Sequence, residues 1–145
     1  MSLTFLFAGC GENTPVVNST TGANGDNTPP ENSPDTTVDL AAEYRKITAV
    51  EAKQMMDGTD PYVLLDVRTE QEYKQQRISG AILIPDTDVV SRAPEEMPDK
   101  NAIILVYCRS GRRSAAASKN LVQMGYINVY DFGGIIDWPY ETISD

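Results

Sequence analysis

Short apolar runs recur along the chain from residue 40 onward, separated by longer stretches of mixed polarity. Short runs in which apolar residues follow one another without alternation are typical of strands buried on both faces of a sheet. The predicted strands are residues 63–67, 81–84, 103–107 and 129–130. Among these, the run at 103–107 gives the strongest strand signal.

Helical signals fill the stretches between these runs. Thr48 and Thr69 are each followed three residues later by Glu, which is the capping-box spacing that opens a helix. A longer helix is predicted over residues 112–124, because Gly125 supplies a stop and apolar residues form an inner face. The residues of that inner face are Ala115, Ala116, Ala117, Leu121 and Met124.

One more short helix is expected between Pro94 and Pro98. Strands that alternate with helices predict an α/β fold, because a connection between neighbouring parallel strands must cross a face of the sheet. We therefore expect a single domain over residues 40–145, with a central parallel sheet of about five strands and helices on both faces.

The chain before residue 40 has a different composition. Residues 11–39 are rich in Asn, Thr, Gly, Pro, Ser and Asp and contain no Lys or Arg, so we expect a disordered spacer. Residues 1–10 form a short apolar run that ends at Cys10 and resembles the end of a bacterial lipoprotein signal, although a positive leading segment is missing. This resemblance implies a lipid anchor on Cys10 and a location in the cell envelope, outside the cytoplasm. The alternative is an incidental apolar start.

Charge and residue usage narrow the chemistry further. The net charge is −9, which argues against nucleic acid as a partner and against adsorption to anionic lipid. The chain has no His, which excludes Cys-His and Ser-His catalytic pairs and His metal ligands. Two Cys far apart in the sequence make a poor zinc site, so no metal and no cofactor is expected. Any nucleophile must therefore be activated by something other than imidazole.

The segment from Tyr107 to Ser114 leads from the strongest predicted strand into the start of a helix. Backbone N–H groups in such a loop can surround an anion, and the helix dipole adds positive potential. Three arginines follow Cys108 within five positions, and this environment favours a thiolate. We predict Cys108 as the catalytic nucleophile. The predicted substrate-binding residues are Arg109, Ser110, Gly111, Arg112 and Arg113. The alternative is a buried core thiol beside a solvated helix start.

Motifs in a fixed order between about residues 47 and 138 resemble the rhodanese family. They are Leu65-Asp66-Val67-Arg68 with Glu72-Tyr73, Ile78-Ser79-Gly80-Ala81, the segment from Val106 to Ser114, and Gly133-Gly134-Ile135 with Trp138. The resemblance implies a sulfurtransferase in which Cys108 takes the outer sulfur of thiosulfate or a similar small anionic donor. The resulting persulfide would pass that sulfur to a thiol or to cyanide, while the loop amides hold it.

Two other functions stay open. Phosphatases that share this fold have a loop one residue longer, with Arg six positions after Cys, where this chain has Ser114. A non-catalytic module that binds a partner through the same pocket is the second alternative. Because Arg113 closes the six-residue ring that begins at Cys108, we expect its loss to matter more than the loss of Arg112.

Several nearby residues are expected to be structural. Asp66 and Arg68 are predicted to form an ion pair or hydrogen-bond network that extends to Glu72, at the end of a strand. The glycine pair at residues 133–134 is expected to let a loop pass close to the site, and Trp138 to pack in the core.

Overall fold

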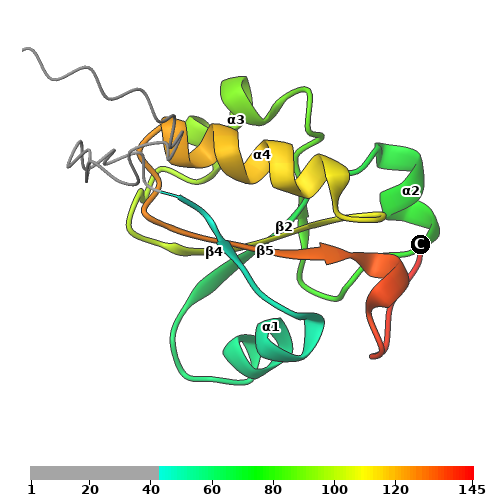
Figure 1. Cartoon of the computed structure of the whole chain (residues 1–145). Coiled ribbons are helices and arrows are strands. Elements are labelled where there is room, and N and C mark those ends of the chain that lie inside the picture. Colours follow the sequence, from blue (N-terminus) through cyan, green and yellow to red (C-terminus); the bar gives the residue numbers. More distant parts are fainter. Residues whose placement is uncertain (1–42) are drawn as a thin grey trace, which may run out of the picture. The chain divides into compact units, whose positions relative to one another are not determined.

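A sheet of five parallel strands forms the centre of residues 43–145, the part of the chain that the computed structural model describes (Figure 1). The strand order is β1-β5-β4-β2-β3. The strands are β1 (Arg45–Lys46), β2 (Tyr62–Asp66), β3 (Ile82–Leu83), β4 (Ile103–Cys108) and β5 (Asn128–Gly134). The predicted α/β class and parallel sheet are confirmed. The expectations for Cys10, for the spacer at 11–39 and for a domain start at residue 40 lie outside the described residues.

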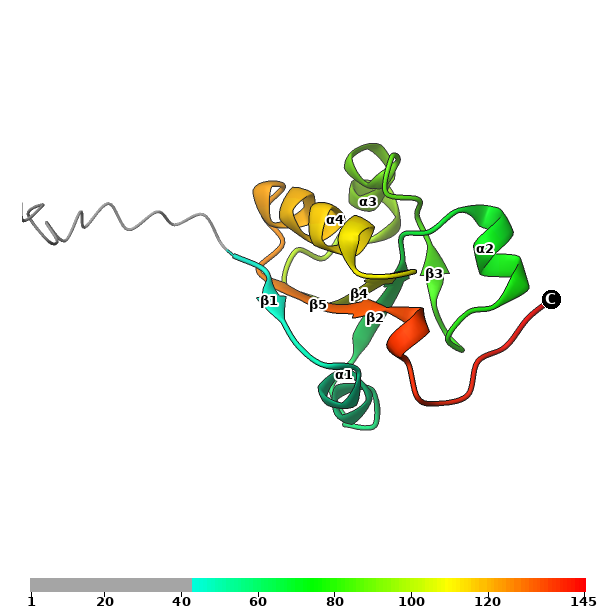
Figure 2. The ribbon, with the colours of Figure 1, turned by 45° about the vertical axis from the view of Figure 1, so that its right-hand side comes forward.

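Helices cover both faces of this sheet, as predicted. Helix α1 (Ala49–Met56) lies on one face, and α3 (Val89–Glu96) and α4 (Arg112–Gln123) lie on the other (Figure 2). Helix α2 (Glu70–Gln75) connects β2 to β3, and the short 3-10 helix η1 (Ile135–Asp137) follows β5. Both predicted capping boxes are formed, at Thr48 and at Thr69. No helix within residues 43–145 is long and apolar enough to cross a bilayer.

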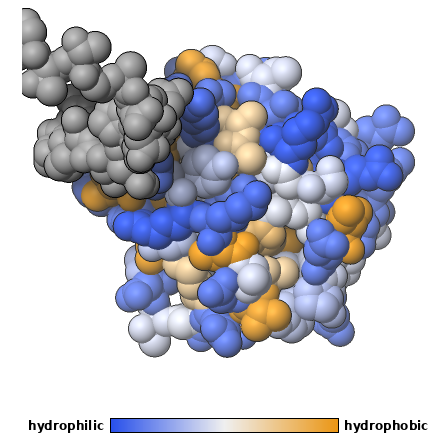
Figure 3. Space-filling model, in the orientation of Figure 1, coloured by the Kyte–Doolittle hydropathy of each residue, from blue (hydrophilic) through white to orange (hydrophobic). Residues whose placement is uncertain are grey.

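Side chains of β4 alternate between two apolar cores, as the two-residue period of a strand requires. Ile104, Val106 and Cys108 belong to the core under α3 and α4, whereas Leu105 and Tyr107 belong to the core on the α1 face. The outer surface is largely hydrophilic in the view of Figure 3. The last residue of β4 therefore carries its thiol toward the start of α4.

The short helix predicted between Pro94 and Pro98 is wrong in its position. Helix α3 begins earlier, at Val89, and contains Pro94. Val89, Ala93 and Met97, spaced four residues apart, are all buried in the core under α4. The free energy gained by burying these three side chains exceeds the free energy lost with the single helical hydrogen bond that a proline removes.

The predicted inner face of α4 is confirmed in part, because Ala117 and Leu121 are buried and Met124 packs against the same core. The buried residues of this helix are Ser114, Ala117, Ser118 and Leu121, while Ala116 is exposed. The helix starts directly after the Cys108 loop, and its first turn brings Ser114 against that loop. Two serines that the apolar pattern left out therefore belong to the buried face of the helix.

Candidate active site

Cys108 is the last residue of β4 and is 1% exposed. Its Sγ accepts a hydrogen bond from the backbone N–H of Gly111, with a nitrogen-to-sulfur distance of 3.0 Å. Gly111 caps α4 in the left-handed conformation, at φ 98°, which a residue with a side chain rarely adopts. The tight loop between strand and helix therefore turns its amides toward the sulfur.

Two opposing effects act on the pKa of Cys108. Burial raises the pKa, because a thiolate loses solvation. Hydrogen bonds from the backbone N–H and hydroxyl of Ser114, and from the N–H groups of Gly111 and Ser110, lower it. The hydrogen bonds prevail, and the pKa lies below the ordinary value for cysteine. The thiolate is thus favoured by loop amides and a serine, with no imidazole involved.

Ser114 is a site residue that the prediction did not include among the binding residues, although the loop motif ends at this position. Its hydroxyl lies 3.1 Å from the Gly111 carbonyl oxygen and 3.3 Å from the Gly133 carbonyl oxygen. A hydroxyl has a single proton to donate, so the sulfur competes with these carbonyls, and the Ser114 backbone N–H is the more constant donor. The sequence did contain a signal for this role. Ser114 lies in the first turn of a predicted helix, where backbone N–H groups have no acceptor within the helix and can bind an anion.

The segment after β5 supports the loop from behind. A Cβ atom added to Gly134 would lie 2.6 Å from the Ser110 Cα, and the Arg109 carbonyl oxygen would be closer still. The backbone N–H of Ile136 donates to that same carbonyl oxygen, at 3.3 Å. The prediction that this glycine pair lets a loop pass close to the site is confirmed.

The three arginines of the loop differ in their surroundings. Arg113 forms two parallel hydrogen bonds to the carboxylate of Glu72 on α2, at 2.7 and 2.8 Å. These bonds lower the pKa of Glu72 to about 2. Arg109 and Arg112 are exposed, and neither forms an ion pair with a carboxylate of residues 43–145. Arg113 is therefore held in place, while the other two remain available to an incoming anion.

Asp66 and Arg68 form a buried ion pair at the end of β2, as predicted. The Arg68 guanidinium donates to both carboxylate oxygens of Asp66, with a shortest distance of 2.6 Å, and also to the Gln76 carbonyl oxygen. Glu72 is not part of this pair, since its carboxylate binds Arg113. The pair joins β2 to the end of α2 beside the Cys108 loop.

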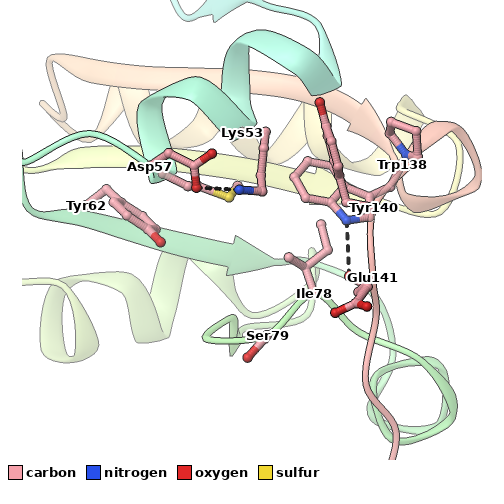
Figure 4. A pocket seen from close by; sticks show the side chains of 10 residues that line it. Lys53, Asp57, Tyr62, Ile78, Ser79, Trp138, Tyr140 and Glu141 are labelled. Carbon is pink, nitrogen blue, oxygen red and sulfur yellow. Dashed lines mark hydrogen bonds and ion pairs between the residues drawn. The ribbon is translucent and has the colours of Figure 1, made fainter.

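Two hollows of similar size have different linings. One, of about 480 Å³, is lined by Arg109, Glu72 and Ile136 and adjoins the loop. The other, of about 520 Å³, lies beside α1 and is lined by Tyr62, Trp138 and Tyr140 (Figure 4). No residue of the Cys108 loop lines this second hollow. Trp138 is 8% exposed and packs against Phe132, which confirms its predicted place in the core.

Comparison with known proteins identifies the family. The family described as "Rhodanese-like domain" matches residues 48–139. The chain belongs to the rhodanese-like family. This rhodanese-like domain is 42% identical over 73 residues to the thiosulfate sulfurtransferase PspE of Escherichia coli K12, across 50% of this chain and 70% of that protein. It is 36% identical over 94 residues to a sulfurtransferase of Allochromatium vinosum, across 64% of this chain and 86% of that protein.

A solved structure described as "rhodanese with anions from E. coli" is also similar. Its TM-score is 0.56 and its sequence identity 36%, and the match covers 59% of this chain and 100% of that chain. These relatives support a rhodanese sulfurtransferase family and hence a transferase. The matched region of the rhodanese-like domain includes both Cys108 and the glycine pair behind its loop.

Gly134→Ala tests the close contact behind the loop. The new methyl group would overlap the Arg109–Ser110 backbone, so the loop must shift. We expect the free energy of unfolding to fall by about 2 kcal/mol, as for an overpacked core. Gly58→Ala is the control, because its Cβ would meet the Met55 carbonyl oxygen at 3.2 Å and the Gln54 carbonyl oxygen at 3.7 Å, with no atom closer. Equal stability of the two variants in thermal melts would contradict the contact.

Glu72→Gln tests the ion pair with Arg113. The folded pKa of Glu72, about 2, lies below its ordinary value of 4.5. The pair therefore stabilises the fold fully above pH 4.5, and this stabilisation is lost as the pH falls toward 2. We expect wild type to melt at a higher temperature than Glu72→Gln at pH 7, and the gap to close in acid. A gap that is independent of pH, or equal to that of the exposed control Glu95→Gln, would refute this.

Proposed function

We propose that this rhodanese-like domain transfers the outer sulfur of thiosulfate, or of a similar small anionic donor, to a thiol or to cyanide. The reaction runs through a persulfide on Cys108. The observation that carries the proposal is the hydrogen bond from the Gly111 N–H to the Cys108 sulfur at the start of α4. It supplies, in a chain without histidine, the activated sulfur nucleophile that this chemistry needs.

The first step is an attack on the donor. The Cys108 thiolate forms a bond to the outer sulfur of thiosulfate, and the sulfur–sulfur bond of thiosulfate breaks. Sulfite leaves with the electron pair of that bond, so three negative charges are present before and after the step. We expect the N–H groups of Ser110, Gly111 and Ser114, which lower the pKa of Cys108, to stabilise the negative charge of the persulfide as well.

The second step restores the enzyme. Cyanide or an acceptor thiolate attacks the outer sulfur of the persulfide and leaves as thiocyanate or as a new persulfide. The electron pair of the broken bond returns to Cys108, which becomes a thiolate again. No proton has to move to or from Cys108 in either step, so the absence of histidine is no obstacle.

Binding of an anionic donor must overcome the negative charge of the whole chain, which is −9. Arg109 and Arg112 provide local positive potential beside the loop, and the first amides of α4 add the helix dipole. The similar E. coli rhodanese is described as a structure with anions, which supports an anionic ligand for this domain. We assign donor capture to these two arginines and loop positioning to Arg113.

The residue six positions after Cys108 argues against the phosphatase alternative. Phosphatases of this fold place an arginine there, and here the position holds Ser114, which is fully buried. Arg113, one position earlier, is bound to Glu72. The lowered pKa of Cys108 favours an enzyme over a passive binding module, since a module that only binds has no use for a thiolate.

Cys108→Ser tests the nucleophile. Serine keeps the size of the side chain but is a poor nucleophile at neutral pH without a base, so thiocyanate production from thiosulfate and cyanide should fall to background. Cys10→Ser is the control and should keep full activity. Turnover by Cys108→Ser would contradict the mechanism. Release of phosphate from aryl phosphates by wild type, without thiocyanate production, would favour the phosphatase.

The double variant Arg109→Gln/Arg112→Gln tests donor capture. Loss of two charged contacts should raise the KM for thiosulfate by roughly tenfold at low salt and change kcat much less. Added salt should raise the KM of wild type and affect the variant less, because screening acts on the charges that the variant lacks. If one of these arginines stabilised the transition state, as the arginine of a phosphatase does, its loss would instead lower kcat. Unchanged KM and unchanged salt dependence would leave only the backbone amides as the anion site.

A further inference from the structure

Asp131 on β5 is fully buried and has no role in the reaction described above. Its Oδ1 accepts a hydrogen bond from the Gly133 N–H at 3.0 Å. Its Oδ2 has no hydrogen-bond partner within residues 43–145, and no Lys or Arg of this region forms an ion pair with it. A buried carboxylate without a cation is unfavourable for stability, so its presence calls for a physical explanation.

The register of the sheet places Asp131 close behind Cys108. Asp131 is the neighbour of Val106 in the ladder between β4 and β5, and Val106 lies two residues before Cys108. Val106 and Cys108 face α4, and so does Asp131, because laterally paired residues point to the same side of a sheet. Strand geometry gives a separation of roughly 8 Å between the Asp131 and Cys108 positions.

A chain of hydrogen bonds connects Asp131 to the reactive loop. The Gly133 N–H donates to Asp131, and the Gly133 carbonyl oxygen accepts from the Ser114 hydroxyl at 3.3 Å. The same hydroxyl lies 3.1 Å from the carbonyl oxygen of Gly111, whose N–H donates to the Cys108 sulfur. Asp131 thereby fixes the glycine turn on which the loop rests.

Ser118 extends this polar arrangement by one helical turn. It is fully buried, and its hydroxyl has no hydrogen-bond partner in the described part of the chain. One turn of helix advances about 5.4 Å and two strand residues about 6.6 Å, so Ser118 lies at the level of Asp131 as Ser114 lies at the level of Gly133. Ser118 is therefore a second buried polar side chain on the helix that packs against β5.

We propose that Asp131 is a positioning residue for Cys108. Its Oδ1 holds the turn at Gly133 under the loop, and its uncompensated negative charge limits how strongly the loop stabilises the thiolate. The inference rests on the proposed function for its purpose, because a thiolate that is stabilised too strongly becomes a weaker nucleophile toward sulfur. A buried counter-charge keeps the sulfur reactive while the amides keep it deprotonated.

Other charged groups around Cys108 differ from Asp131 in being paired or at least partly exposed. Arg113 of α4 is bound to Glu72 of α2, and Arg68 is bound to Asp66. The remaining groups are the exposed Arg109 and Arg112 beside the loop, Asp86 after β3 and Lys46 of β1, the ladder neighbour of Asp131. Lys46 is exposed as well, and Asp86 is half-buried. Asp131 thus combines full burial with the lack of a partner cation.

Two variants of the full chain separate the roles of shape and charge. Asp131→Asn keeps an acceptor for the Gly133 N–H and removes the charge, whereas Asp131→Leu removes both at similar size. Asp57→Asn, an exposed carboxylate on the α1 side, is the control for loss of a charge. Alkylation of Cys108 by iodoacetamide is followed against pH by peptide mass spectrometry, beside thiosulfate kinetics.

We expect Asp131→Asn to keep the turn intact and to lower kcat/KM for thiosulfate by roughly threefold, because a more strongly stabilised thiolate is a weaker nucleophile. The midpoint of its alkylation profile should move to lower pH, while that of Asp57→Asn stays in place. Asp131→Leu should lose roughly tenfold or more in kcat/KM, as expected for a displaced catalytic group.

An alkylation midpoint in Asp131→Asn equal to that of wild type would overturn the proposal, and so would wild-type kcat/KM in a folded Asp131→Leu variant. If circular dichroism shows that Asp131→Leu does not fold, the Asn variant decides alone. Alkylation does not depend on sulfur transfer, so failure of the proposed function and failure of this inference remain distinguishable.

Discussion

The left-handed turn at Gly111 is the constraint on which the site depends. Only with φ near 98° does the chain leave β4 and enter α4 within three residues, so that the N–H of Gly111 reaches the Cys108 sulfur at 3.0 Å. A loop this tight leaves no room behind it, which explains why Gly134 follows at the end of β5. The strand, the turn and the helix start thus form one rigid unit around the sulfur.

This unit accounts for chemistry without histidine. Burial alone would raise the pKa of Cys108, and the N–H groups of the loop reverse that effect. The surrounding ion pairs hold the elements that carry the loop: Arg113 ties α4 to α2 through Glu72, and Arg68 ties the end of β2 to the end of α2 through Asp66 and Gln76. Arg113 and Arg68 are held in ion pairs, whereas Arg109 and Arg112 are exposed and can bind an incoming anion.

Much of this could be predicted from local patterns. The capping boxes, the buried strands and the Cys108 loop depend on residues that are close in sequence. The sequence pattern therefore predicts them. The predicted position of helix α3 is wrong because the burial of Val89 and Ala93 stabilises the helix more than Pro94 destabilises it. That burial depends on the tertiary fold, which local patterns do not show. The pairing of Arg113 with Glu72 spans 41 residues, and the position of Asp131 depends on sheet register. No spacing rule reveals such contacts.

The most direct test of the account is the mass of Cys108 after exposure to thiosulfate without an acceptor. The purified chain is treated with thiosulfate, desalted under non-reducing conditions and digested, and the peptide with Cys108 is weighed. We predict an added mass of one sulfur atom, about 32 Da, that disappears when cyanide is added. A peptide of unchanged mass, from protein that produces thiocyanate in the same preparation, would contradict a persulfide on Cys108.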